Sequence, residues 1–225
     1  MLSLIKNVKR GSWRGNSHEH IVSESANTSR HDLSWLELLT GVLVGAAGAG
    51  MLMAALPSAV LPRITHRMLG LPGPGSGVAV VGPLVALVAL LNYLLVKKQG
   101  VMLLCCAVLG TLHSIFMQGI FPSAKTVGTA GPLPLRILAV VVLGVTLELT
   151  VRLLARCNRW PRYMVSAACG SLAFLVFYWA ALYPFTGKRP VTFQRAVILG
   201  AVTAGAGALL GGPLPGLFDP LRRQD

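Results

Sequence analysis

Aromatic and polar side chains that could bind a small molecule gather around the fifth apolar run of the sequence. Five rings crowd into residues 177–185, namely Phe177, Tyr178, Trp179, Tyr183 and Phe185. Trp179 and Tyr183 are four residues apart, so they share one face of an α-helix. Gln194 opens the next apolar run, and Arg136 opens the preceding one. Aromatic walls with a few polar anchors are typical of ligand pockets, so we predict a small-molecule site formed by Arg136, Trp179, Tyr183 and Gln194. An aromatic belt at a membrane surface is the alternative explanation, because Trp and Tyr favour that depth in any membrane helix.

A few polar residues lie inside the apolar runs. Glu148 precedes Arg152 by four residues, a spacing that predicts a local ion pair on one helix face. A coupling or transport role for Glu148 is the alternative, since an acid at membrane depth is a functional hypothesis in itself. We interpret Asn92, His113 and Gln118 as hydrogen-bond partners between helices.

Catalytic and metal-binding patterns are missing from the sequence. His113 is the single histidine within an apolar run, so two histidines cannot hold a haem there. The four cysteines have no metal-ligand spacing, and we find no phosphate-binding loop, nucleophile elbow or zinc-protease helix. We therefore expect no enzyme active site, no metal and no cofactor.

Small residues recur at four-residue spacing in the first and last apolar runs. Gly41, Gly45 and Ala49 form one such face, and a second face is formed by Gly200, Ala204, Ala208 and Gly212. Such faces allow another helix to approach closely. The partner helix can belong to the same chain or to another subunit, and the second alternative predicts docking at Gly41, Gly45 and Ala49.

The composition is that of an integral membrane protein. Of the 225 residues, 54% are hydrophobic and only 12% are charged, and the mean hydropathy is +0.67. An ordinary soluble domain has roughly 25% charged residues, and disordered chains are poor in apolar ones, so both classes are excluded. The net charge of +13 is explained by basic loops that orient a membrane protein, and we expect no nucleic-acid partner.

Six apolar runs are long enough to cross a bilayer as helices, and they predict an all-α fold with six transmembrane helices. Their approximate limits are 34–57, 76–96, 100–121, 133–155, 163–184 and 194–217. The chain then divides into a polar basic tail over 1–33, a membrane domain over 34–217, and a short tail over 218–225.

The distribution of basic residues predicts the orientation. With six spans, the side that holds both termini receives 13 Lys and Arg, and the other side receives 7. Basic loops favour the cytoplasm, so both termini are predicted to be cytoplasmic, with the protein in the plasma (inner) membrane. The mitochondrial inner membrane is a minor alternative, because the opening MLSLIKNVKR is similar to a presequence, although Glu19 and Glu24 weigh against it.

The order of these features resembles the substrate-binding S component of energy-coupling factor (ECF) transporters over residues 34–217. The resemblance lies in the small-residue first helix, a connection ending LPGPGSG, a span closed by KKQG, and a fourth run reading PLRILAVVVLGVTLELTVRL. It implies capture of a vitamin, metal ion or similar micronutrient from outside by helices four to six, under the first connection. The implied binding residues are Arg136, Trp179, Tyr183, Gln194 and His66. Gly41, Gly45 and Ala49 would dock on the transmembrane T component, which sits on two ATPases.

A second hypothesis makes the chain a non-catalytic accessory subunit of a larger respiratory or oxidative membrane complex. It explains a long polar tail, because a partner can hold such an extension in place. Small-residue helix faces and the lack of an active site agree with it equally well. Contact of the tail with another polypeptide would favour the accessory subunit, and an enclosed pocket at Trp179 would favour the transporter.

Overall fold

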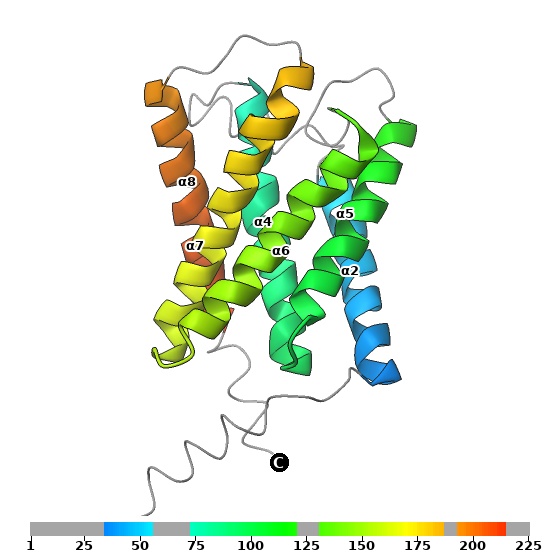
Figure 1. The fold of residues 1–225 in the computed structure, drawn as a ribbon, viewed down its shortest axis with the longest axis vertical. Helices are drawn as coiled ribbons and strands as arrows, with labels where there is room; N and C mark the ends of the chain where they lie inside the picture. Colours follow the sequence, from blue (N-terminus) through cyan, green and yellow to red (C-terminus); the bar gives the residue numbers. More distant parts are fainter. Residues whose placement is uncertain (1–33, 56–72, 121–130, 187–192, 215–225) are drawn as a thin grey trace, which may run out of the picture. The chain divides into compact units, whose positions relative to one another are not determined.

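The structure is a computed structural model that describes residues 34–55, 73–120, 131–186 and 193–214. These residues form six α-helices and no strand, which confirms the all-α prediction for this part of the chain. In chain order the helices are α2 (Trp35–Ala55), α4 (Gly73–Val96), α5 (Val101–Ile120), α6 (Leu133–Leu153), α7 (Arg159–Phe177) and α8 (Phe193–Gly211). All of them belong to the unit Ser34–Asp225 (Figure 1). The tails predicted over 1–33 and 218–225 lie outside the described residues.

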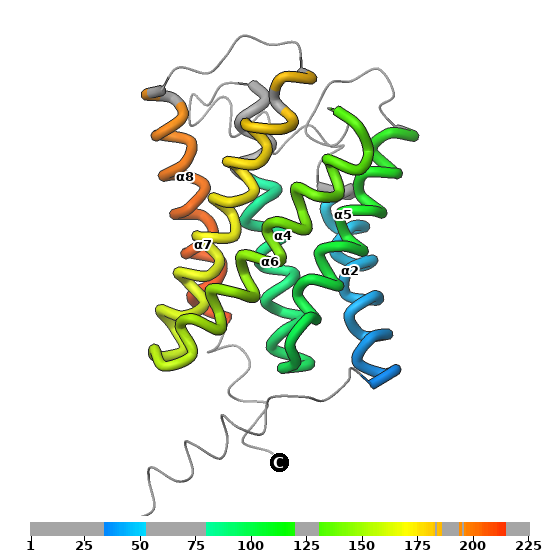
Figure 2. The backbone as a smooth tube through the Cα atoms, viewed as in Figure 1, coloured from blue at the N-terminus to red at the C-terminus, as the bar shows by residue number. Residues whose placement is uncertain are grey.

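Helix α4 lies at the centre of the bundle. It packs against all five other helices, which contact one another in the order α2, α5, α6, α7, α8 (Figure 2). No charged residue occurs between Gly73 and Val96, so α4 can be enclosed without burying a charge. Val85, Ala86, Ala89 and Leu90 of α4 are completely buried and form the middle of the apolar core.

A tight turn over residues 97–100 joins α4 to α5. Lys97 has a φ of 56°, and its N–H donates to the Tyr93 carbonyl at 2.7 Å, which closes the last turn of α4. Gly100 has a φ of 83°, a backbone conformation that is easy for glycine and strained for other residues. The turn therefore sends α5 back antiparallel to α4.

The outer surfaces of the bundle are apolar. Four helical stretches are long and apolar enough to cross a membrane, namely Trp35–Leu52, Val101–Gly119, Leu133–Leu153 and Arg159–Leu182. Shorter apolar stretches occur at Val80–Val96 and Ala196–Gly211. Large apolar side chains such as Leu43, Leu149 and Val176 are exposed. These helices indicate a membrane-associated protein.

The limits of the last two helices differ from those expected from hydropathy. Helix α7 begins at Arg159 and not near 163, because Pro161 lies in its first turn, where a proline removes no helical hydrogen bond. Helix α8 ends at Gly211 and not at 217, where Gly212 and Pro213 follow. Beyond Phe177 the backbone forms a π-helix, η1 (Tyr178–Leu182), and then a 3-10 helix, η2 (Tyr183–Thr186).

Candidate small-molecule site

Arg136 is buried where α5 ends and α6 begins, which we call the α5–α6 end of the bundle. Its side chain lies in the first turn of α6 and is only 5% exposed. The Nη2 atom donates to Gln118 Oε1 of α5 at 3.1 Å. This bond confirms the prediction that Gln118 is a hydrogen-bond partner between helices. A guanidinium is thus fixed among apolar helices, a position that is costly for a charge without polar neighbours.

A small, partly open cavity lies beside Arg136. Its polar lining comes from His113 and Ser114 of α5 together with Arg136, and its apolar lining includes Val85, Phe174 and Leu182. The space for an occupant is about that of one water molecule. The cavity is thus lined by residues of five segments, α4, α5, α6, α7 and η1, and its polar groups come from α5 and α6.

His113 and Ser114 are polar cavity residues that do not belong to the site predicted from the sequence. His113 is 5% exposed, and its Nδ1 atom is buried with no hydrogen-bond partner among the residues that the structure describes. That atom therefore does not make the interhelical bond predicted for this side chain. The signal was present in the sequence, because a histidine at membrane depth is a candidate functional residue.

Trp179 lies next to the cavity lining but is not part of it. Phe174, Tyr178 and Leu182 are buried along one side of the α7–η1 segment, and the first and last of them line the cavity. Trp179 packs against the edge of the core, and its Nε1 atom is buried without a partner among the described residues. The aromatic side chain in the cavity lining is therefore that of Phe174, and not that of Trp179.

The other predicted binding residues do not join Arg136 in this cavity. Gln194 is exposed near the start of α8, a helix that packs on α4 and α7, and it does not line the cavity. The Tyr183 side chain and His66 lie outside the described residues. Of the five predicted residues, the structure places only Arg136 in the cavity lining.

The face formed by Gly41, Gly45 and Ala49 packs inside the bundle. All three residues are buried. A Cβ atom built on Gly41 would lie 3.0 Å from Leu104 Cδ2, and one built on Gly45 would lie 2.9 Å from the Cys105 carbonyl oxygen. The face therefore contacts α5 of the same chain and is not available to a T component in this conformation.

The small residues of the α8 segment also pack inside the bundle, and of the predicted face Gly212 approaches α7, where a Cβ atom would lie 3.0 Å from Met164 Cγ. The closest approaches are at Gly207 and Gly211, where a Cβ atom would lie 2.8 Å from the Ala167 oxygen and 2.7 Å from the Tyr163 oxygen of α7. At Gly200 the nearest neighbouring atom is 3.7 Å away. The contact face of α8 thus runs through Gly207 and Gly211.

Polar contacts at the opposite end join the α4–α5 turn to two other helices. Glu148 Oε1 accepts a bond from Arg152 Nη2 at 2.8 Å, which confirms the predicted ion pair, and also one from the Gly100 N–H. Glu37 Oε2 binds Lys98 Nζ at 2.7 Å. These contacts give both acids a structural role.

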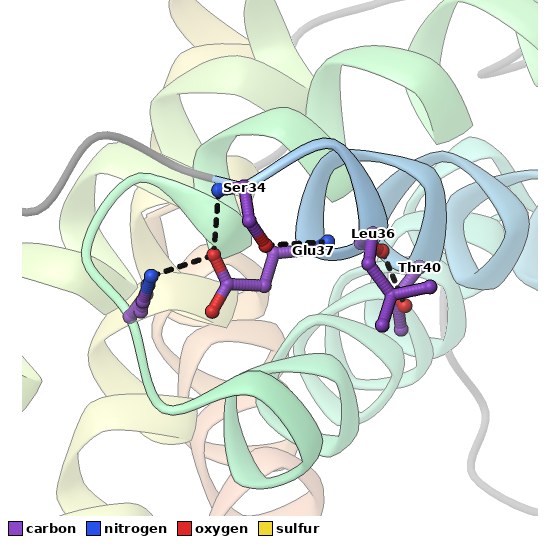
Figure 3. A network of polar contacts seen from close by, with 5 residues as sticks. Ser34, Leu36, Glu37 and Thr40 are labelled. Carbon is purple, nitrogen blue, oxygen red and sulfur yellow. Dashed lines mark hydrogen bonds and ion pairs between the residues drawn. The ribbon is translucent and has the colours of Figure 1, made fainter.

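Near this end, a further hydrogen bond joins α4 to α5, and two more define the start of α2. Asn92 Nδ2 of α4 donates to the Val101 carbonyl of α5 at 3.4 Å, as predicted for a partner between helices. At the start of α2, the Ser34 N–H donates to Glu37 Oε2 at 2.7 Å, and the Glu37 N–H donates to Ser34 Oγ at 3.4 Å (Figure 3). This reciprocal arrangement is a capping box, which begins α2 at Trp35.

Comparisons of the chain with models of protein families, with curated proteins and with solved structures gave no match.

Proposed function

We propose that this protein is a six-span membrane subunit that binds a small anionic solute at the α5–α6 end, in the manner of an ECF-type S component. The observation that carries the proposal is the burial of Arg136 beside a cavity with polar residues in its lining. A charged side chain inside a membrane bundle is costly, and such residues mark ligand or ion sites. The fixed positive charge favours an anionic group on the solute.

The proposed topology places both termini and the α6–α7 turn in the cytoplasm. Figure 1 supports it, because the start of α2, the end of α8 and the α6–α7 turn lie at the same end of the described helices. Four basic residues occur in or beside that turn, namely Arg152, Arg156, Arg159 and Arg162. Such a concentration is typical of a cytoplasmic loop, so the cavity would open toward the outside.

The topology can be tested with the native thiol Cys157, which is exposed in the α6–α7 turn. We expect a membrane-impermeant maleimide to label Cys157 only after intact cells are permeabilised. A Cys157→Ser chain is the control for labelling elsewhere. In that background, a cysteine in place of the exposed Pro132 before α6 should be labelled from outside. Labelling of Cys157 in intact cells would overturn the proposed orientation.

The solute site can be tested by replacing Arg136 with glutamine. The chain is purified from its native membrane, and the small molecules retained by it are identified by mass spectrometry. We expect Arg136→Gln to lower solute retention about tenfold to a hundredfold, the equivalent of one or two hydrogen bonds to a charged group. The control is Arg156→Gln in the exposed turn. Equal retention by both variants, at equal amounts of folded protein, would contradict the proposal.

An accessory subunit of a larger complex is the second candidate, and the surface of α2 favours it. Only 28% of the membrane-length stretch of α2 is buried, against 44–50% in the other three stretches of that length. Trp35, Leu39 and Leu43 are exposed on α2 and leave apolar area for a partner helix. Co-purification with respiratory or oxidative subunits, without a T component or ATPases, would support this candidate.

A further inference from the structure

We infer that the cavity beside Arg136 is a carboxylate subsite, in which one oxygen of the solute lies among Arg136, His113 and Ser114. The inference rests on the proposed function and names the chemical class of its solute. Neither His113 nor Ser114 belongs to the site predicted from the sequence. Three features of the cavity carry the inference: its size, the character of its polar lining, and the buried nitrogen of His113.

The size of the cavity restricts what can enter it. The space is about that of one water molecule, so it accepts a single oxygen atom of a larger solute. A carboxylate can place one oxygen there and leave the rest of the molecule outside. A phosphate or sulfate group has more oxygen atoms left outside the cavity than a carboxylate, and these would lie near the apolar lining of Val85, Phe174 and Leu182, which cannot bind them.

The polar lining selects an acceptor with negative charge. A guanidinium has five N–H donors and no acceptor, so an atom bound to Arg136 must accept. The hydroxyl of Ser114 can donate to the same atom. A cation is excluded by the arginine, and the two carboxylates of the described residues, Glu37 and Glu148, bind Lys98 and Arg152 at the other end of the bundle.

The Nδ1 atom of His113 supplies the third contact. It is buried without a partner among the described residues, on a side chain that is 95% buried and lines the cavity. A buried polar atom without a bond destabilises the fold, and a ligand that satisfies it gains that free energy on binding. In the tautomer with a proton on Nδ1, the ring donates to the carboxylate oxygen.

The test measures thermal unfolding of the purified full chain in detergent with small probes of different charge. Acetate and formate should raise the unfolding midpoint in a saturable way, because a ligand bound only by the folded state stabilises it. Acetamide has a similar shape to acetate but no charge, and it should have no effect. An equal response to acetate and acetamide would overturn the inference. If chloride competes with acetate as strongly as formate does, the cavity is a site for inorganic anions. That result would also overturn the inference.

Variants then locate the subsite. Ser114→Ala and His113→Phe should each weaken acetate binding about tenfold, the loss expected for one hydrogen bond to a charged group. Ser166→Ala is the matched control, because Ser166 is a buried serine of α7 that does not line the cavity. His113→Asn, which keeps a side-chain donor, should retain more affinity than His113→Phe. Equal acetate affinity in Ser114→Ala and Ser166→Ala would contradict the assignment.

Failure of the subsite and failure of the proposed function give different results. One result is that Arg136→Gln loses the native solute while acetate does not change the unfolding midpoint of the wild-type chain. This result would contradict the carboxylate subsite and still support solute binding. The other result is that acetate binding depends on Ser114 and His113, but the chain co-purifies with no solute and no importer subunits. This result would support the subsite and contradict the importer function.

Discussion

Replacing Gly207 with leucine is expected to separate α8 from α7 and to prevent stable folding. A Cβ atom at this position would lie 2.8 Å from the Ala167 carbonyl oxygen and 2.8 Å from Ser171 Oγ. The carbonyl belongs to the backbone of α7, so the contact can be relieved only by moving a helix. Overpacking of this kind costs about 1–3 kcal/mol and sometimes more, and here it affects a close approach of two helix backbones. The measurements are the yield of monodisperse protein and the midpoint of thermal unfolding.

A control for this variant lies on the same helix. Gly205 is exposed and has no neighbouring atom within 4 Å of its built Cβ, so Gly205→Leu should fold normally. Both substitutions change helix propensity and apolarity in the same way, and therefore differ only in the contact that they disturb. Similar yields and midpoints for the two variants would show that α7 and α8 do not approach each other at Gly207.

Replacing Gly45 with leucine should also lower the stability of the isolated chain. The added Cβ would lie 2.9 Å from the Cys105 carbonyl oxygen and 3.1 Å from Val108 Cβ, so α2 would have to move away from α5. We expect a loss of about 1–3 kcal/mol. The measurement is thermal unfolding of the purified chain without partners. Gly50→Leu is the control, because Gly50 is exposed on α2 with open space around it.

The same variant distinguishes packing within the chain from docking on another subunit. If the face of Gly41, Gly45 and Ala49 serves a partner, the isolated Gly45→Leu chain keeps its normal midpoint and loses only its assembly with that partner. A normal midpoint together with lost assembly would therefore contradict the packing of α2 on α5. Because Gly45 is buried within the chain, we expect the Gly45→Leu chain to have a lower unfolding midpoint even without a partner.

The helices and the local polar contacts could be predicted from the sequence because both depend on short-range pattern. Apolar runs bounded by Pro, Gly and charge located the six helices within a few residues at most ends. The pair of Glu148 and Arg152 follows from a spacing of four residues, which places both side chains on one helix face. These short-range patterns do not depend on how the helices pack against one another.

The candidate site could be predicted only in part, because it depends on how each helix is rotated about its axis. Trp179 and Tyr183 share a face in an α-helix, but residues 178–182 form a π-helix with a wider turn, so the four-residue rule does not apply there. In α8, small residues occur on every side, and the pattern alone does not select Gly207 over Gly200. His113 could be located at membrane depth, but not the cavity that it faces, because that cavity is formed by five separate segments.

The central position of α4 suggests how the bundle assembles during synthesis. Helices α2, α4 and α5 are already joined by the contacts of Glu37 with Lys98 and of Asn92 with Val101. They can therefore associate as soon as α5 has left the ribosome. The remaining sides of α4, which α6, α7 and α8 later cover, are apolar and can face lipid in the meantime. Arg136 and His113 can then be enclosed together only after α6 and the α7–η1 segment have been inserted, because Phe174 and Leu182 complete the lining, so the polar cavity forms late.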